Sequence, residues 1–150
     1  MADVITFQMT NKMNCFHHFQ PRVEAFGEKH GLPMKIVFHL NLVLDELITN
    51  IISYGYTDFD EHPIHVTVGL ERDTITIRLE DDAQPFNILE APEPEFDVPL
   101  DERIKPVGGM GVHLVKNMVN HIDYRREDGK NVLLLTKNIS KPCCPAHGRP

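Results

Sequence analysis

Apolar and polar residues alternate along three segments of the chain, 4–9, 64–70 and 75–79. This period of two predicts β-strands that each have one apolar face. The short turn Glu71-Arg72-Asp73 separates the last two segments, which indicates a hairpin. One side of the resulting sheet is therefore expected to be covered by other elements.

Other segments repeat apolar residues every three or four positions, which predicts helices. The first runs from about Lys12 to His30, and its Pro21 must lie in the first turn or bend the helix. The second runs from about Met34 to Ser53 and ends at Gly55. Its expected core stripe is Leu40, Val43 or Leu44, Leu47 and Ile51.

A glycine cluster, Gly108-Gly109-Met110-Gly111, opens a third predicted helix. The apolar positions of this helix are Val112, Val115, Met118 or Val119, and Ile122. Two strands follow, at about Asp123–Glu127 and Asn131–Lys137, around the hairpin signal Asp128-Gly129. The Pro-rich segment 82–106 is too long for a plain connector, so it is either a lid or binding loop, or a solvated surface loop.

Strands that are paired by hairpins, with helices between the pairs, predict an α+β fold. We expect a two-layer α/β sandwich, with a mostly antiparallel sheet and the helices on one face. A chain of 150 residues suits a single domain, placed at 1–140, followed by a flexible tail at 141–150.

Composition disfavours several classes of protein. The formal net charge of -7 argues against a general binder of nucleic acid or of anionic membranes. No apolar run approaches the roughly 20 residues that cross a bilayer, and the N-terminus does not resemble a signal peptide. Cys15, Cys143 and Cys144 do not form a disulfide framework, and neither they nor the histidines have zinc-site spacing. A cytoplasmic protein is the simplest interpretation.

The second helix carries a carboxylate and an amide in an otherwise apolar run. Glu46 and Asn50 are four positions apart, about 40° around the axis, so they share a face beside the core stripe. That face is either simply solvated, or it is a site where the amide oxygen binds Mg²⁺ and the carboxylate accepts a proton.

Two further signals accompany this pair. Asp81 is in phase with the apolar face of its strand, so it either points inward to a hydrogen-bond donor such as a base amino group, or lies past the strand end in water. Gly108, Gly109 and Gly111 would let a phosphate approach a helix N-terminus, although many glycine turns bind nothing.

The order of these signals resembles the anti-sigma regulatory factor family, small serine/threonine protein kinases with the ATP-binding fold shared by gyrase and histidine kinases (GHKL). The similar stretches are DELITNIISYGY, the strand ending in DDAQPFN, and GGMGVHLVKNMVNHIDY, within about Met34 to Lys137. The resemblance implies Glu46 as general base, Asn50 as Mg²⁺ ligand and Asp81 as the adenine contact. It also implies a phosphate site at Gly108, Gly109 and Gly111, with the Pro-rich segment as an ATP lid.

The resemblance implies an ATP- and Mg²⁺-dependent kinase that phosphorylates an antagonist protein and sequesters a sigma factor, in a possible homodimer without direct nucleic-acid or membrane contact. One departure leaves an alternative open. The wider superfamily often has D-x-G-x-G, whereas this chain has Ala83 and Pro85. A module that binds nucleotide or partners without phosphoryl transfer is therefore the second hypothesis. A histidine-kinase ATPase domain is a third, disfavoured by the absence of a phosphoacceptor helix pair.

Overall fold

The computed structural model describes residues 3–12, 15–90 and 109–139. The elements in chain order are β1 (Asp3–Thr10), α1 (Cys15–Lys29), α2 (Met34–Tyr54), β2 (Pro63–Glu71), β3 (Thr74–Asp81), the 3₁₀ turn η1 (Ile88–Glu90), α3 (Gly109–Met118), β4 (His121–Glu127) and β5 (Lys130–Asn138). The glycine Gly108, most of the Pro-rich segment and the tail at 141–150 lie outside the described residues.

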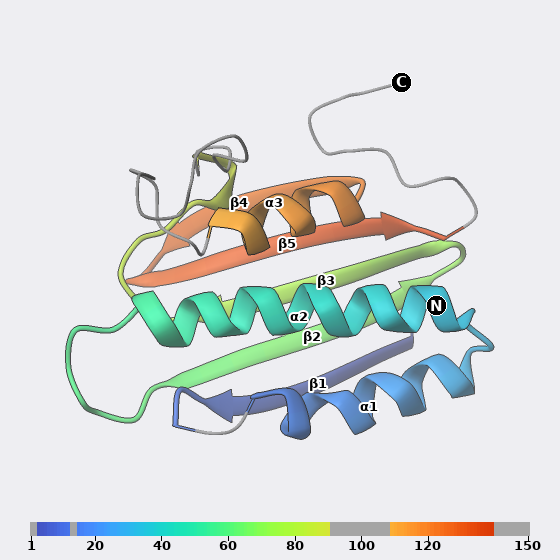
Figure 1. The fold of residues 1–150 in the computed structure, drawn as a ribbon, viewed down its shortest axis with the longest axis horizontal. Helices are drawn as coiled ribbons and strands as arrows, with labels where there is room; N and C mark the ends of the chain where they lie inside the picture. The colour runs from blue at the N-terminus through green and yellow to red at the C-terminus, as the bar shows by residue number, and fades with distance from the viewer. Residues whose placement is uncertain (1–2, 13–14, 91–108, 140–150) are drawn as a thin grey trace, which may run out of the picture.

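The strands form one sheet in the order β1-β2-β3-β5-β4, and every neighbouring pair is antiparallel. The three α-helices of the described residues lie on the same face of this sheet, with α2 between α1 and α3 (Figure 1). The predicted α+β fold, a two-layer sandwich with helices on one face, is confirmed.

The core fills the space between the sheet and the helices. Its largest fully buried side chains are Phe19, Met9, Leu40, Leu44, Ile48, Ile64, Ile75, Ile77, Leu79, Leu135, Val23 and Val43. In the predicted stripe of α2, Ile51 is only partly buried, because it lies in the last turn of the helix. Ile48 and Asn41 are buried in addition, so the buried face of α2 is wider than predicted.

Of the two predicted places for Pro21, the first turn of the helix is excluded. This residue lies inside α1 rather than in the first turn, and it is exposed. Burial of Phe19, Val23 and Phe26 offsets the backbone hydrogen bond that a proline removes. Gly31 follows the helix with φ of 63°, which glycine adopts without strain.

The end of α3 also differs from the sequence pattern. The helix stops at Met118, and the predicted helical position Ile122 lies in β4. The Lys137 ammonium donates a 2.6 Å hydrogen bond to the Met118 carbonyl, and the Asn120 amide donates to Thr136 of β5. These hydrogen bonds join the chain to β5 directly after Met118, so α3 does not continue for another turn.

By length and apolar composition alone, α2 could cross a bilayer. In the fold it packs Leu40, Leu44 and Ile48 against the sheet, and its remaining surface carries both polar side chains and the exposed apolar residues Met34 and Phe38. The apolar character of α2 is therefore accounted for by its place as the central core helix.

Candidate active site

The candidate site lies at the end of the sheet where the C-terminal half of α2, the end of β3 and the start of α3 converge (Figure 1). Asp81 is the last residue of β3, and its side chain is only 5% exposed. Its Oδ1 accepts hydrogen bonds from the Ala83 amide at 3.0 Å and from Asn131 Nδ2 at 2.9 Å. Both bonds fall on Oδ1, so no described residue donates a hydrogen bond to Oδ2.

The pKa of Asp81 is raised, chiefly because burial penalises the charged carboxylate. The hydrogen bonds from Asn131 and Ala83 lower it and partly oppose that effect. An inward carboxylate with one oxygen left without a donor can accept a hydrogen bond from a ligand amino group.

Asn131 organises the turn that follows Asp81. It is 6% exposed and stands opposite Asp81 in the register of β3 and β5. Besides Asp81, its Nδ2 donates to the Gln84 carbonyl at 3.0 Å, and its Oδ1 accepts from the Tyr124 hydroxyl at 2.5 Å. Sequence reasoning gave no role to this residue. An isolated amide in the apolar run of β5 was the available signal, and only the strand register shows its partner.

Ala83 and Pro85, which stand where the wider superfamily often has glycine, both lie in this turn. Ala83 is buried, and its carbonyl accepts a 2.7 Å hydrogen bond from Arg126 Nη1. Among the described non-glycine residues, only Arg72 and Asp128 have positive φ. Ala83 and Pro85 therefore form the turn in ordinary backbone conformations, and the turn requires no glycine at either position.

The end of α2 is tied to the same turn. The Gln84 amide donates to the Gly55 carbonyl at 2.9 Å, and Gln84 Nε2 donates to the Tyr54 carbonyl at 2.7 Å. A side chain at Gly55 would meet the Cβ of Ala83 at 2.7 Å, so only glycine allows this approach. The helix that carries Glu46 and Asn50 is thereby fixed relative to Asp81.

Glu46 faces the first turn of α3. A Cβ placed on Gly111 would collide with Glu46 Oε2, so the backbone of α3 lies directly against this carboxylate. The absence of a side chain at Gly111 makes this contact possible. The pKa of Glu46 is raised by burial first and by the charge of Asp45 second. A carboxylate with a raised pKa is better matched to accepting a proton near neutral pH.

Asn50 lies one turn after Glu46 on α2 and is partly buried. Its Nδ2 is buried without a hydrogen-bond partner among the described residues. Gly109 is the first residue of α3, and the first N–H groups of an α-helix have no acceptor within the helix. The structure thus brings Glu46 and Gly111 into contact, and the hydrogen bonds of Gln84 tie the turn after Asp81 to the C-terminal end of α2.

The neighbouring acid, Asp82, belongs to a separate cluster. It is exposed, and its Oδ2 lies 3.1 Å from His62 Nδ1, while Asp58 Oδ1 lies 2.8 Å from His62 Nε2. The ring of Tyr56 stacks on the imidazole with centroids 4.2 Å apart. The hydrogen bonds with Asp58 and Asp82 raise the pKa of His62. Asp82 is thus engaged with His62, whereas Asp81 points into the fold.

The candidate site therefore contains the Glu46 carboxylate and the Asn50 amide on α2, and the N-terminus of α3. Asp81 adds an inward-pointing carboxylate at the end of β3. Backbone N–H groups at a helix start favour phosphate groups. Among the described residues, no group of three or more His, Cys, Asp or Glu side chains could hold a metal ion. A cation at Asn50 would therefore need oxygen ligands from a bound substrate, as Mg²⁺ commonly has.

The sequence model of the histidine kinase-like ATPase domain matches residues 16–137. This chain belongs to the histidine kinase-like ATPase domain family. Among curated proteins, serine/threonine-protein kinase BtrW of Bordetella bronchiseptica is 30% identical over 104 residues, which are 69% of this chain and 72% of that protein. Serine-protein kinase RsbW of Listeria monocytogenes is 23% identical over 144 residues, 94% of this chain and 90% of that protein. The resemblance drawn from the sequence motifs is confirmed.

Proposed function

We propose that this protein is an ATP-dependent serine/threonine protein kinase of the anti-sigma type. The observation that carries the proposal is the packing of Gly111 against Glu46, at the convergence of α2 and α3 and in a chain of the ATPase family. The two relatives named as serine or serine/threonine kinases support the same chemistry. In this proposal the protein acts in the cytoplasm, phosphorylates an antagonist protein and sequesters a sigma factor.

Each site residue has a role in the proposed reaction. Asp81 accepts a hydrogen bond from the adenine amino group, and Gly108, Gly109 and Gly111 line the phosphate site. Glu46 accepts the proton of a serine hydroxyl as its oxygen bonds to the γ-phosphorus and the bond to ADP breaks. Mg²⁺, held through Asn50, would neutralise charge on the phosphates. That neutralisation matters here because the Glu46 carboxylate lies beside the start of α3.

The direct test incubates the purified protein with Mg-ATP and a candidate antagonist protein, and measures phosphoserine by mass spectrometry. Glu46→Gln should lower the transfer rate by about 10²-fold or more, because a positioned general base contributes that much. Glu71→Gln is the matched control, since Glu71 is exposed at the far end of β2, and it should retain the wild-type rate. The wild-type rate should also fall as the pH drops through the raised pKa of Glu46.

A thermal-shift assay with Mg-ADP separates nucleotide binding from transfer. At about 100 times Kd, ADP should stabilise the fold by about 2.7 kcal/mol, a shift on the order of 5–10 °C. Asp81→Asn should abolish most of this shift. No shift in the wild type, at ligand concentrations well above a plausible Kd, would overturn any nucleotide role.

A second candidate function is a nucleotide- or partner-binding switch without transfer. It is favoured by Ala83 and Pro85, which replace the usual glycines beside the adenine site and change how closely the backbone can approach a ligand. Tight ADP binding without phosphoserine formation on any candidate antagonist would establish this function and exclude the kinase.

A further inference from the structure

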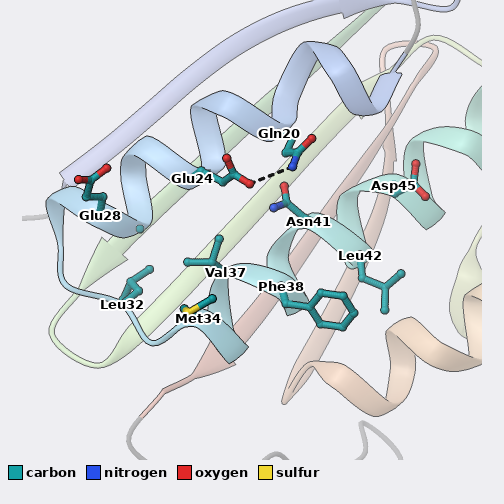
Figure 2. A pocket seen from close by; sticks show the side chains of 11 residues that line it. Gln20, Glu24, Glu28, Leu32, Met34, Val37, Phe38, Asn41, Leu42 and Asp45 are labelled. Carbon is teal, nitrogen blue, oxygen red and sulfur yellow. Dashed lines mark hydrogen bonds between the residues drawn. The ribbon is translucent and has the colours of Figure 1, made fainter.

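A groove with no role in the proposed chemistry runs between α1 and α2, on the opposite side of α2 from α3 (Figures 1 and 2). Its volume is about 490 Å³. Leu32, Val37 and Leu42 provide apolar lining, and Gly27 keeps the two helices close, because a Cβ there would collide with Val37. The groove is therefore formed by the packing of α1 on α2.

One buried polar group in this groove is unsatisfied. Asn41 is 8% exposed, and its Oδ1 has no hydrogen-bond partner among the described residues. Figure 2 shows its side chain projecting from α2 toward α1, near the hydrogen bond from Gln20 to Glu24. A buried acceptor without a donor costs free energy, roughly 1–3 kcal/mol. A ligand that donates a hydrogen bond to Asn41 would recover this loss.

The charge of the groove has one sign. Glu24, Glu28 and Asp45 line it, and none of the described Lys, Arg or His side chains does. Glu24 accepts its 2.9 Å hydrogen bond from the neutral amide of Gln20, so its charge is not compensated there. An occupant that bears ammonium or guanidinium groups would match these carboxylates.

Large apolar side chains remain open to solvent at the same place. Met34 is 88% exposed and Phe38 is 62% exposed, both on the surface of α2 that borders the groove. Apolar side chains gathered beside a groove, with charged residues around them, are typical of a protein-binding surface.

We propose that this groove binds a basic, amphipathic helix of a partner protein. Both walls are helices whose backbone groups are already hydrogen-bonded, so an extended segment would find no sheet edge to join. A bound segment must therefore satisfy its own backbone, as a helix does. Its apolar face packs on Phe38 and Val37, a Lys or Arg donates to Asn41 Oδ1, and further basic residues lie along Glu24 and Glu28. The proposal concerns a surface apart from the nucleotide site and does not require kinase activity.

The test uses a fluorescein-labelled peptide of about 18 residues, five helical turns, with Leu at i, i+3, i+4 and i+7 and Lys elsewhere. Fluorescence anisotropy in the absence of nucleotide gives its affinity for the full chain. The double variant Glu24→Lys/Glu28→Lys should bind about tenfold more weakly. The double variant Glu61→Lys/Glu71→Lys changes the net charge equally at exposed positions outside the groove and should bind like the wild type.

A second variant separates this site from general attraction between a basic peptide and an acidic protein. Asn41→Leu should weaken peptide binding severalfold while raising the melting temperature of the free protein, because it removes a buried acceptor without a donor. Amide chemical shifts should change at Val37, Phe38 and Asn41 on peptide addition.

Equal weakening of peptide binding in both charge variants, or chemical-shift changes confined to the sheet, would overturn the proposal. So would concentration-dependent dimerisation that Phe38→Glu abolishes, since a second copy would then be the occupant.

Discussion

Asn131 should be the polar side chain on which the candidate site depends most for its shape. Replacing it with Leu keeps the number and branching of the side-chain heavy atoms and removes hydrogen bonds to Asp81 at 2.9 Å, to the Gln84 carbonyl at 3.0 Å and from the Tyr124 hydroxyl at 2.5 Å. The bond to a charged group is worth about 1.5–3 kcal/mol, and the neutral ones about 1 kcal/mol each. Asn131→Leu should therefore lower the free energy of unfolding by about 3–5 kcal/mol.

The free energy of unfolding that Asn131→Leu loses should be smaller at acidic pH than at neutral pH. Burial raises the pKa of folded Asp81 above its unfolded value, so the ionised carboxylate destabilises the fold at neutral pH. Stability from this group increases as the pH falls from the folded pKa toward the unfolded value of about 3.9. Because the hydrogen bond from Asn131 lowers the folded pKa of Asp81, removing Asn131 raises that pKa further. The pH range over which acidification stabilises the fold then extends to higher pH in the variant. The difference in unfolding free energy between variant and wild type should therefore narrow as the pH falls from neutral toward the unfolded pKa of Asp81.

Urea unfolding followed by circular dichroism measures both effects, and the midpoint should fall by about 1.5–2.5 M at pH 7 with little change in slope. Thr136→Ala serves as the control, because Thr136 lies on the same strand in the opposite side-chain phase and is half-buried. It should cost less than about 1 kcal/mol. A loss below about 1 kcal/mol for Asn131→Leu, or a gap that does not narrow on acidification, would refute this reasoning.

Three further predictions concern the surroundings of α3. Gly111→Ala should destabilise the fold by about 1–3 kcal/mol in thermal unfolding, because its methyl group overlaps the Glu46 carboxylate. Lys137→Met should cost about 1–3 kcal/mol in urea unfolding, since it leaves the Met118 carbonyl without its 2.6 Å donor. The same Lys137→Met variant should raise the pKa of His39 in an NMR titration, because the Lys137 charge lowers it, although burial remains the larger cause of the lowered value.

Each of these predictions has an internal check. Adding Glu46→Ala to Gly111→Ala should recover stability, and additive losses in the double variant would exclude the proposed overlap. An unchanged stability in Lys137→Met would show that the helix end does not need this donor. An unchanged His39 pKa would show that the Lys137 charge is too far away, or too well solvated, to act on the imidazole.

Sequence patterns alone anticipated most of the backbone. Alternation identified the strands, and the signal Asp128-Gly129 identified a hairpin whose two residues both have positive φ, 51° and 76°. The prediction that Ile122 belongs to the helix was wrong, because Ile122 lies in β4. Apolar residues spaced three to four positions apart cannot show where a helix ends and a strand of the sheet begins. Long-range hydrogen bonds from β5, through Lys137 and Thr136, decide that end.

The sequence also contained the candidate site, but not its geometry. Glu46, Asn50, Asp81 and Gly111 carry the chemistry that their residue types imply, and local periodicity places Glu46 beside Asn50 on one helix face. That Asn131 stands opposite Asp81, and that Gly111 rests on Glu46, depends on strand register and helix packing. Those contacts join residues 50 and 65 positions apart in the chain. Local propensity carries no information about contacts between residues so far apart in the sequence. The tertiary structure alone therefore decided which residues support the site. It also decided which buried polar groups, such as Asn41 Oδ1, have no hydrogen-bond partner among the described residues.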